Sequence, residues 1–153
     1  MKTISFLLIA MTMAFLVSQA GAAEWVSLGK DGPGNECFYD KQTLTKLPND
    51  IIRVWIMNVY SDEARKKYIQ RRISDGLADD KRYETLSYSL SMWEINCAAR
   101  EYRGMANIDY STNRGKLETN TYEHQPLEGW RPVPPESIGE VMYKAICPQQ
   151  AKK

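Results

Sequence analysis

The sequence predicts an α+β domain: an antiparallel β-sheet of five or six short strands in a meander, with a C-terminal helix packed on it and a surface helix near residues 61–76. Three observations support this fold. Segments of alternating polar and apolar residues recur along the chain, turn-forming residues separate them, and the apolar spacing becomes helical after residue 137. The chain has 153 residues, 43% hydrophobic and 25% charged, which is typical of one ordinary domain.

Residues 1–23 have the pattern of a secretory signal peptide. Lys2 is followed by a mainly apolar run over residues 4–17 and then by small residues, with cleavage expected near Ala22 or Ala23. The run is shorter than the roughly 20 residues that span a bilayer. No cysteine precedes Cys37, so no lipid-attachment cysteine lies at the cleavage site. We therefore expect a single mature domain, residues 24–153, that is periplasmic or secreted and has no membrane anchor.

The first strands are predicted on either side of a hairpin loop. Residues 25–28 and 37–39 each read as a short strand, and the glycine- and proline-containing segment 30–35 joins them. Residues 51–60 form the strongest strand in the sequence, because β-branched and aromatic residues dominate it. We expect this strand to lie in the centre of the sheet.

A helix is predicted over residues 61–76. Ser61 can cap it, acidic residues occupy its first turn, and Arg71 and Arg72 lie late in it, which is the charge order that a helix dipole favours. Its apolar stripe, Ile69, Ile73 and Leu77, is narrow, so the helix is expected to lie loosely on the surface. Its basic side chains are interleaved with acidic ones, which indicates a solvated face.

The segment from residue 83 onward predicts the remaining strands. Between residues 86 and 92, large apolar side chains alternate with serines, and from Trp93 to Cys97 the apolar residues continue in the opposite phase. Such a change of phase predicts either a β-bulge or a sheet whose second face becomes covered there. Residues 102–110 and 117–122 read as two more strands, joined by a turn at 111–115.

The C-terminal helix follows Pro134 and Pro135. Its expected apolar stripe needs a surface to cover, and the sheet is the natural one. Pro148 ends the helix. On an ideal helix Cys147 would point away from the stripe, so a bond from Cys147 to the sheet requires the last turn to unwind. The stripe consists of Ile138, Val141, Met142 and Ala145.

Three cysteines predict one disulfide and one free thiol in an oxidising compartment, and three pairings are possible. The chain contains no C-x-x-C motif. His124 is its only histidine, so neither a zinc site nor another cofactor is expected. Cys37 lies among apolar neighbours in a predicted strand and is interpreted as an inert thiol. The balance of 20 basic and 19 acidic residues argues against binding to nucleic acid.

Landmarks along the whole predicted mature chain resemble the surface-adhesin protein E family. The most specific match is the segment 130–147. The other landmarks are Trp25, Phe38, Tyr39, Arg53, Trp55, Tyr88, Glu94, Cys97 and Tyr110. The resemblance implies an antiparallel sheet with a C-terminal helix held by a Cys97–Cys147 disulfide, in a bacterial envelope or secreted protein. Cys37 is additional to the family pattern, and none of the landmarks is identified as ligand-binding.

Three functions are weighed from the sequence. The resemblance and the many aromatic residues favour a noncatalytic module that binds an extracellular or envelope protein or a glycan. Trp25, Trp55 and Trp93 fall in strands, where packing into the core is the commoner role. A carboxylate-dependent enzyme would have to use pairs such as Asp62–Glu63 or Asp79–Asp80, which are adjacent in sequence and are expected to diverge. A periplasmic carrier of small ligands would need a cavity between sheet and helix.

Overall fold

The computed structural model describes residues 22–75, 81–121 and 129–147. Apart from Ala22 and Ala23, the predicted signal peptide lies outside this part, as does His124. Two α-helices and two 3₁₀ helices accompany the sheet: α1 (Asp62–Ser74), α2 (Ile138–Ile146), η1 (Lys41–Thr43) and η2 (Lys81–Thr85). The strands are β1 (Trp25–Lys30), β2 (Glu36–Asp40), β3 (Thr45–Leu47), β4 (Ile51–Val59), β5 (Leu86–Asn96), β6 (Glu101–Ser111), β7 (Lys116–Thr121) and β8 (Arg131–Pro132).

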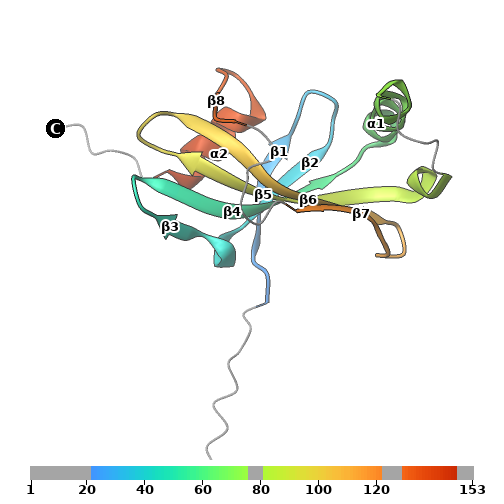
Figure 1. Cartoon of the computed structure of the whole chain (residues 1–153), viewed down its shortest axis with the longest axis horizontal. Helices are drawn as coiled ribbons and strands as arrows, with labels where there is room; N and C mark the ends of the chain where they lie inside the picture. The colour runs from blue at the N-terminus through green and yellow to red at the C-terminus, as the bar shows by residue number, and fades with distance from the viewer. Residues whose placement is uncertain (1–21, 76–80, 122–128, 148–153) are drawn as a thin grey trace, which may run out of the picture.

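All strand pairs are antiparallel, and the main path through the sheet is β1-β2-β4-β5-β6-β7 (Figure 1). The predicted α+β meander is therefore confirmed. The described residues form an eight-stranded sheet, against the predicted five or six, because β3 and β8 have only three and two residues and leave no clear alternation in the sequence. The predicted central strand is β4, which pairs with β2, β3 and β5.

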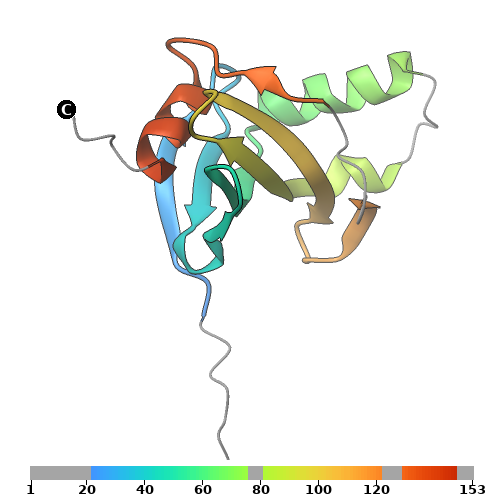
Figure 2. The same ribbon diagram turned by 60° about the vertical axis from the view of Figure 1, so that its left-hand side comes forward.

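Helix α2 covers one face of the sheet. It lies behind β5 and β6 in Figure 1 and comes into clear view at the left in Figure 2. Met142 and Ile146 are buried against a cluster from β1, β2, β4 and β5, with Ile138 packed beside them. The predicted stripe was wrong in part: Val141 is 45% exposed and Ala145 is exposed too, because the helix presents the row spaced by four residues to the sheet. The buried cluster comprises Leu28, Cys37, Ile52, Val54, Ile56, Ile95, Met142, Ile146 and Cys147.

A disulfide between Cys97 and Cys147 ties α2 to the turn after β5, with 5.6 Å between the two Cα atoms. This is the pairing that the family resemblance implied. Cys147 caps α2 in an extended conformation, so the helix ends one residue earlier, as the geometry of the stripe required. The Tyr143 hydroxyl donates to the Cys97 carbonyl at 2.9 Å, and Arg100 pairs with Glu140 at 2.6 Å. The helix is thus held by covalent and polar contacts together.

The phase change in β5 coincides with a β-bulge. Met92 pairs with Ala106 and Trp93 with Gly104, so Met105 is the extra residue, on β6. A bulge is therefore present at the predicted place, but on β6, so β5 keeps its own alternation. The other prediction, a second face that becomes covered, accounts for the change of phase, because Ile95 is 0% exposed and packs with α2. The face that α1 and α2 share carries the serines, and Ser89 is only 1% exposed, whereas Leu90 on the opposite face is half-buried. Alternation alone did not indicate which face would be covered.

Helix α1 lies at the other end of the sheet from α2 (Figures 1 and 2). Ser61 caps it by accepting from the amide of Ala64 at 3.1 Å, as predicted. The face that meets the sheet is Ala64, Tyr68 and Arg72, while Ile73 is 46% exposed. The predicted stripe was therefore wrong at Ile73, because a tyrosine and an arginine fill this contact through polar and ring interactions, and Leu77 lies outside the described residues. The predicted loose packing is confirmed, since Ala64 is the one buried residue of α1.

Removal of the disulfide is expected to destabilise the fold strongly. A double variant, Cys97→Ser with Cys147→Ser, should lose about 2–5 kcal/mol of unfolding free energy, because its unfolded chain is no longer constrained by a link that spans 50 residues. Urea unfolding followed by circular dichroism measures this loss. A reducing agent should destabilise the native protein equally and leave the double variant unchanged. A loss below about 1 kcal/mol would show that the noncovalent contacts alone hold α2.

Candidate binding surface

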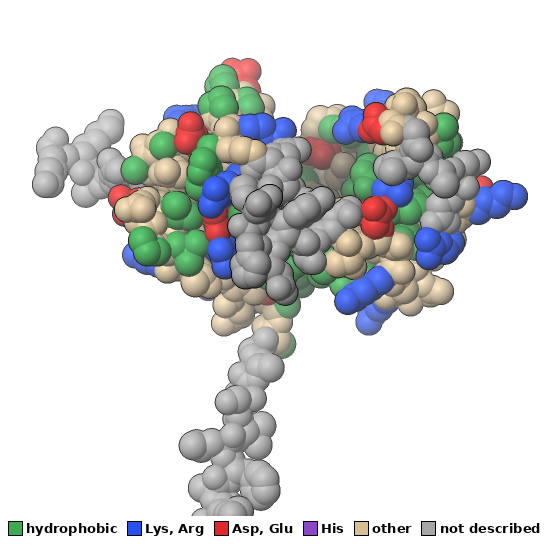
Figure 3. Space-filling view, viewed as in Figure 1, with side chains coloured by type: hydrophobic (Ala, Val, Ile, Leu, Met, Phe, Trp, Pro, Cys, Tyr) green, Lys and Arg blue, Asp and Glu red, His purple; other side chains and the backbone are tan. Residues whose placement is uncertain are grey.

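The face of β4, β5 and β6 that is turned away from α2 is here called the outer face. It carries large side chains that are only partly exposed to solvent. Because side chains alternate along a strand, Arg53, Trp55 and Met57 point opposite to the buried Val54 and Ile56. Figure 3 shows apolar side chains on the side turned to the viewer, with basic and acidic ones among them. The half-buried apolar members from the three strands are Trp55, Met57, Tyr88, Leu90, Met92, Ile108 and Tyr110.

Two stacked tyrosines form one part of the outer face. Tyr88 and Tyr110 are cross-strand partners on β5 and β6, and their rings stack with centroids 4.8 Å apart and planes 7° from parallel. Cross-strand aromatic pairs stabilise a sheet and restrict each other's rotamers. This part of the face therefore offers a rigid aromatic platform.

Three charged residues, here called the Arg–Glu–Arg triad, lie across β4, β5 and β6. Arg53 donates to Glu94 Oε1 from Nε and Nη2 at 3.0 and 2.5 Å. Arg103 donates to Oε2 from the same two atoms at 2.9 and 2.6 Å. The Glu94 side chain is 2% exposed, while those of Arg53 and Arg103 are 40% and 24% exposed. A buried anion thus fixes two partly exposed cations.

The pKa of Glu94 reports the balance within the triad. Burial by itself would raise this pKa, but the hydrogen bonds and charges of Arg53 and Arg103 outweigh burial and hold it below the ordinary value of 4.5. Glu94 is therefore ionised at neutral pH, and the triad carries a net charge of plus one. Arg103 also lies 4.3 Å from the ring centre of Trp130, a cation–π contact with the segment before β8.

A second polar cluster lies under α1. The Asp109 carboxylate, 1% exposed, accepts from Tyr68 at 2.8 Å and from Asn107 at 3.0 Å. The Tyr83 hydroxyl lies 3.2 Å from Asp109 and 2.7 Å from Glu118. Burial raises the pKa of Tyr68 and of Tyr83, so both remain protonated donors at neutral pH. The Tyr83 hydroxyl thus lies between the Asp109 and Glu118 carboxylates, and Asp109 is enclosed by its own partners.

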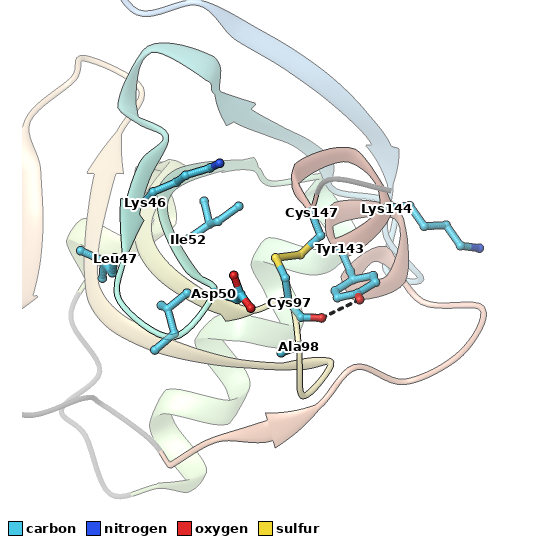
Figure 4. Close-up of a pocket in the computed structure, with 10 residues that line it drawn as sticks. Lys46, Leu47, Asp50, Ile52, Cys97, Ala98, Tyr143, Lys144 and Cys147 are labelled. Atoms are coloured by element: carbon cyan, nitrogen blue, oxygen red, sulfur yellow. Dashed lines mark hydrogen bonds between the residues drawn. A yellow bond between two sulfur atoms is a disulfide. The ribbon is translucent and has the colours of Figure 1, made fainter. Parts of the chain in front are cut away.

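A hollow of about 470 Å³ lies beside the disulfide (Figure 4). Lys46, Asp50 and Ile52 stand on its sheet side and Tyr143 on its helix side, while Lys144 points away. Asp50 is the one carboxylate among its lining residues, so the hollow holds no acid–base pair. Its volume falls in the range of about 300–1,000 Å³ that is typical of small-ligand sites.

A smaller cavity of about 120 Å³ lies between α2 and the sheet, beside the contacts that pack them together. Cys37, Trp93 and Met142 are among its lining residues. Cys37 is 2% exposed, and its thiol donates to the carbonyl of Asn35 at 3.7 Å. Burial, with the negative charge of Asp31, raises the pKa of Cys37 to about 11. Cys37 is thus the free cysteine of the structure, and its surroundings are those of an inert thiol.

The family model for surface-adhesin protein E matches residues 25–148. The chain belongs to this family. Comparison with curated proteins finds no match. Membership in the surface-adhesin protein E family implies a surface or exported protein. Within the described residues, no helix is long and apolar enough to cross a membrane.

Of the two candidate catalytic pairs, the structure of this surface-adhesin E protein describes Asp62 and Glu63, and these do not converge on a site. Asp62 pairs with Arg65 and Glu63 with Lys67 on the exposed side of α1, so the two carboxylates diverge. Asp79 and Asp80 lie outside the described residues. Among the residues that are described, no group of three or more His, Cys, Asp and Glu side chains could hold a metal ion.

Sequence analysis did not identify the triad, although two of its members are family landmarks. Arg53 and Glu94 are 41 residues apart and become neighbours only in the register of β4 with β5. Of the three strand tryptophans, Trp93 packs against the buried cluster as expected, whereas Trp55 belongs to the outer face. The sequence did contain a signal for the triad: Arg53 and Glu94 each stand between apolar residues on one of two central strands.

The variant Glu94→Gln should destabilise this domain and change its response to pH. Removal of the buried anion leaves two arginines facing each other, at an expected cost of about 3 kcal/mol at pH 7. Because the pKa of Glu94 is lowered in the folded state, its stabilising effect is present at neutral pH and is lost as the pH falls from about 4.5 downward. Urea unfolding at several pH values should therefore show a weaker acid dependence in this variant.

Glu63→Gln is the matched control for that experiment, since Glu63 forms an exposed pair with Lys67 on α1. The unfolding free energy of this variant should stay within about 1 kcal/mol of the native value at pH 7, because both the ion pair and the helix-dipole interaction of Glu63 are exposed to solvent. Equal stability of Glu94→Gln and Glu63→Gln would contradict the structural role of the triad.

Cys37 should resist thiol reagents in the folded protein. Oxidised protein is expected to react with a disulfide-exchange reagent at pH 8 only after denaturant is added, and then with one equivalent, because Cys37 is buried and its pKa is raised to about 11. Absorbance of the released thiolate measures the reaction. Rapid labelling without denaturant would show that the thiol is accessible.

Proposed function

We propose that this protein is an exported, noncatalytic binding protein of the bacterial envelope that presents its outer face to a protein or glycan partner. The observation that carries the proposal is the composition of this face. Half-buried aromatic and aliphatic side chains surround two arginines that a buried carboxylate holds in place. Aromatic residues and arginine are the residue types that contribute most to binding energy at interfaces.

We also propose that the protein is not an enzyme, on two grounds. Family membership favours adhesion. The Asp109 and Glu118 carboxylates both lie within hydrogen-bond distance of the Tyr83 hydroxyl, and Asp109 is 1% exposed. A general acid or base needs contact with the substrate, which an enclosed carboxylate lacks.

Transport of a small ligand is the alternative function. The cavity between α2 and the sheet, about 120 Å³, is below the size of typical small-ligand sites. The hollow beside the disulfide, at about 470 Å³, is large enough for a small ligand. It is the observation that favours the carrier function. Its position at the surface, beside Lys46 and Lys144, suits a ligand that stays partly exposed.

Export through a cleaved signal peptide of residues 1–23 is also proposed, to the periplasm or the exterior. Ala22 and Ala23 are exposed and precede β1, so cleavage beside them would leave the sheet intact. The disulfide is consistent with this route, because such bonds persist in oxidising compartments.

A charged substitution on the outer face should abolish partner binding. Leu90→Lys places a cation in the middle of the half-buried apolar residues of β5, whereas Ile73→Lys makes the same kind of change on the exposed side of α1. Immobilised mature protein would be tested in pull-downs from envelope extract and from host matrix components. We expect Leu90→Lys to lose the bound material, by about tenfold or more, and Ile73→Lys to retain it.

Both variants must first match the native protein in thermal unfolding. Equal capture by the native protein and by Leu90→Lys would place binding elsewhere on the molecule. A blank from both extracts with the native protein would count against a binding function altogether.

A further inference from the structure

A second, shallower hollow of about 310 Å³ lies on the outer face beside the triad. It forms where η1 and β3 approach β4 and β5. The backbone amide of Trp55 donates to the Thr43 hydroxyl at 3.1 Å, and the Thr43 hydroxyl donates to the Asp40 carbonyl at 2.9 Å. These bonds fix one wall of the hollow. Its lining residues are Thr43, Thr45, Arg53, Val54, Trp55 and Met92.

Arg53 brings a preorganised cation to this hollow. Its Nε and Nη2 atoms are held by Glu94, and among the described residues Nη1 has no hydrogen-bond partner. The side chain is 40% exposed although its partner Glu94 is buried. Because the triad holds two cations against one anion, one positive charge remains uncompensated. A guanidinium oriented in this way can bind a carboxylate with little further loss of side-chain entropy.

The other walls of the hollow are suited to a ring. Trp55 and Met92 supply an aromatic and a thioether surface, and the Thr45 hydroxyl, on an exposed residue, supplies a polar rim. An aromatic side chain offers a flat apolar surface on which the C–H face of a saturated ring can lie, while hydroxyls around that ring reach polar neighbours. A cation, a flat apolar wall and a hydroxyl therefore lie together in one small hollow.

We propose that this hollow binds a carboxylate-bearing sugar residue, with its carboxylate on Arg53 and its ring against Trp55. The inference rests on the proposed binding function and specifies its ligand class as an acidic glycan. An acidic peptide side chain would satisfy Arg53 but leave Trp55 and Met92 uncovered. A neutral sugar would cover Trp55 but leave the cation without a partner. An acidic sugar satisfies both.

The test uses calorimetric titration of the oxidised mature protein with a short hyaluronan oligosaccharide, which carries carboxylates and no sulfate. The same oligosaccharide with its carboxylates methyl-esterified is the ligand control, and a short polyglutamate peptide tests charge alone. The variants are Arg53→Gln and Lys46→Gln. Lys46 is one residue from Thr45 but lines the hollow beside the disulfide, so it loses the same charge outside the proposed site.

We expect the acid to bind the native protein at least about tenfold more tightly than the ester or polyglutamate. Arg53→Gln should lose about tenfold in affinity for the acid, and Lys46→Gln should match the native protein. The ester comparison uses unaltered protein, so it stands whether or not Arg53→Gln folds. Equal binding of acid and ester, equal binding of polyglutamate, equal loss in the two variants, or no heat with the acid up to about 10 mM would each overturn the inference.

The pull-down described above separates this inference from the proposed function. Captured material that Leu90→Lys loses, together with no oligosaccharide binding, would leave the binding function in place and reject the acidic sugar.

Discussion

The attachment of α2 to the turn between β5 and β6 decides which face of the sheet becomes the core. A nine-residue helix has little stability of its own in water, because the free energy of nucleation is unfavourable and its few hydrogen bonds do not offset it. The Cys97–Cys147 bond, the Tyr143 hydroxyl and the Arg100–Glu140 pair hold it in place. With α2 held there, Ile52, Val54 and Ile95 are removed from water, and the other face of the same strands is left for a different use.

The outer face owes its character to the triad. Arg53 and Arg103 saturate both oxygens of Glu94, so a carboxylate that is 2% exposed is fully hydrogen-bonded. A buried ionic group such as the triad adds little net stability compared with apolar residues of similar volume, since the cost of desolvation opposes the attraction between the charges. What it provides is position: two cations are fixed at the surface beside Trp55 and Trp130. The proposals for this face depend on that fixed geometry.

The two ends of the covered face use different chemistry. Under α2 the strands present aliphatic side chains, and under α1 they present Ser89 and Asp109, both 1% exposed. Tyr68 from α1 and Tyr83 from η2 donate into this polar end, and Arg72 lies 4.0 Å from the ring centre of Tyr83. Polar groups can be buried here because α1 brings partners for them. The serines of β5 therefore belong to the interior.

The sequence by itself determined the meander, the central strand β4, both helices and the serine cap of α1, because these follow from local spacing and from the hydrogen bonds of single side chains. The family resemblance supplied the disulfide. Only the tertiary structure decided that Ser89 is buried and Leu90 is half-exposed, and that Arg53, Glu94 and Arg103 meet. Alternation separates two faces without saying which one a helix covers, and the triad exists only through the register of three strands distant in sequence.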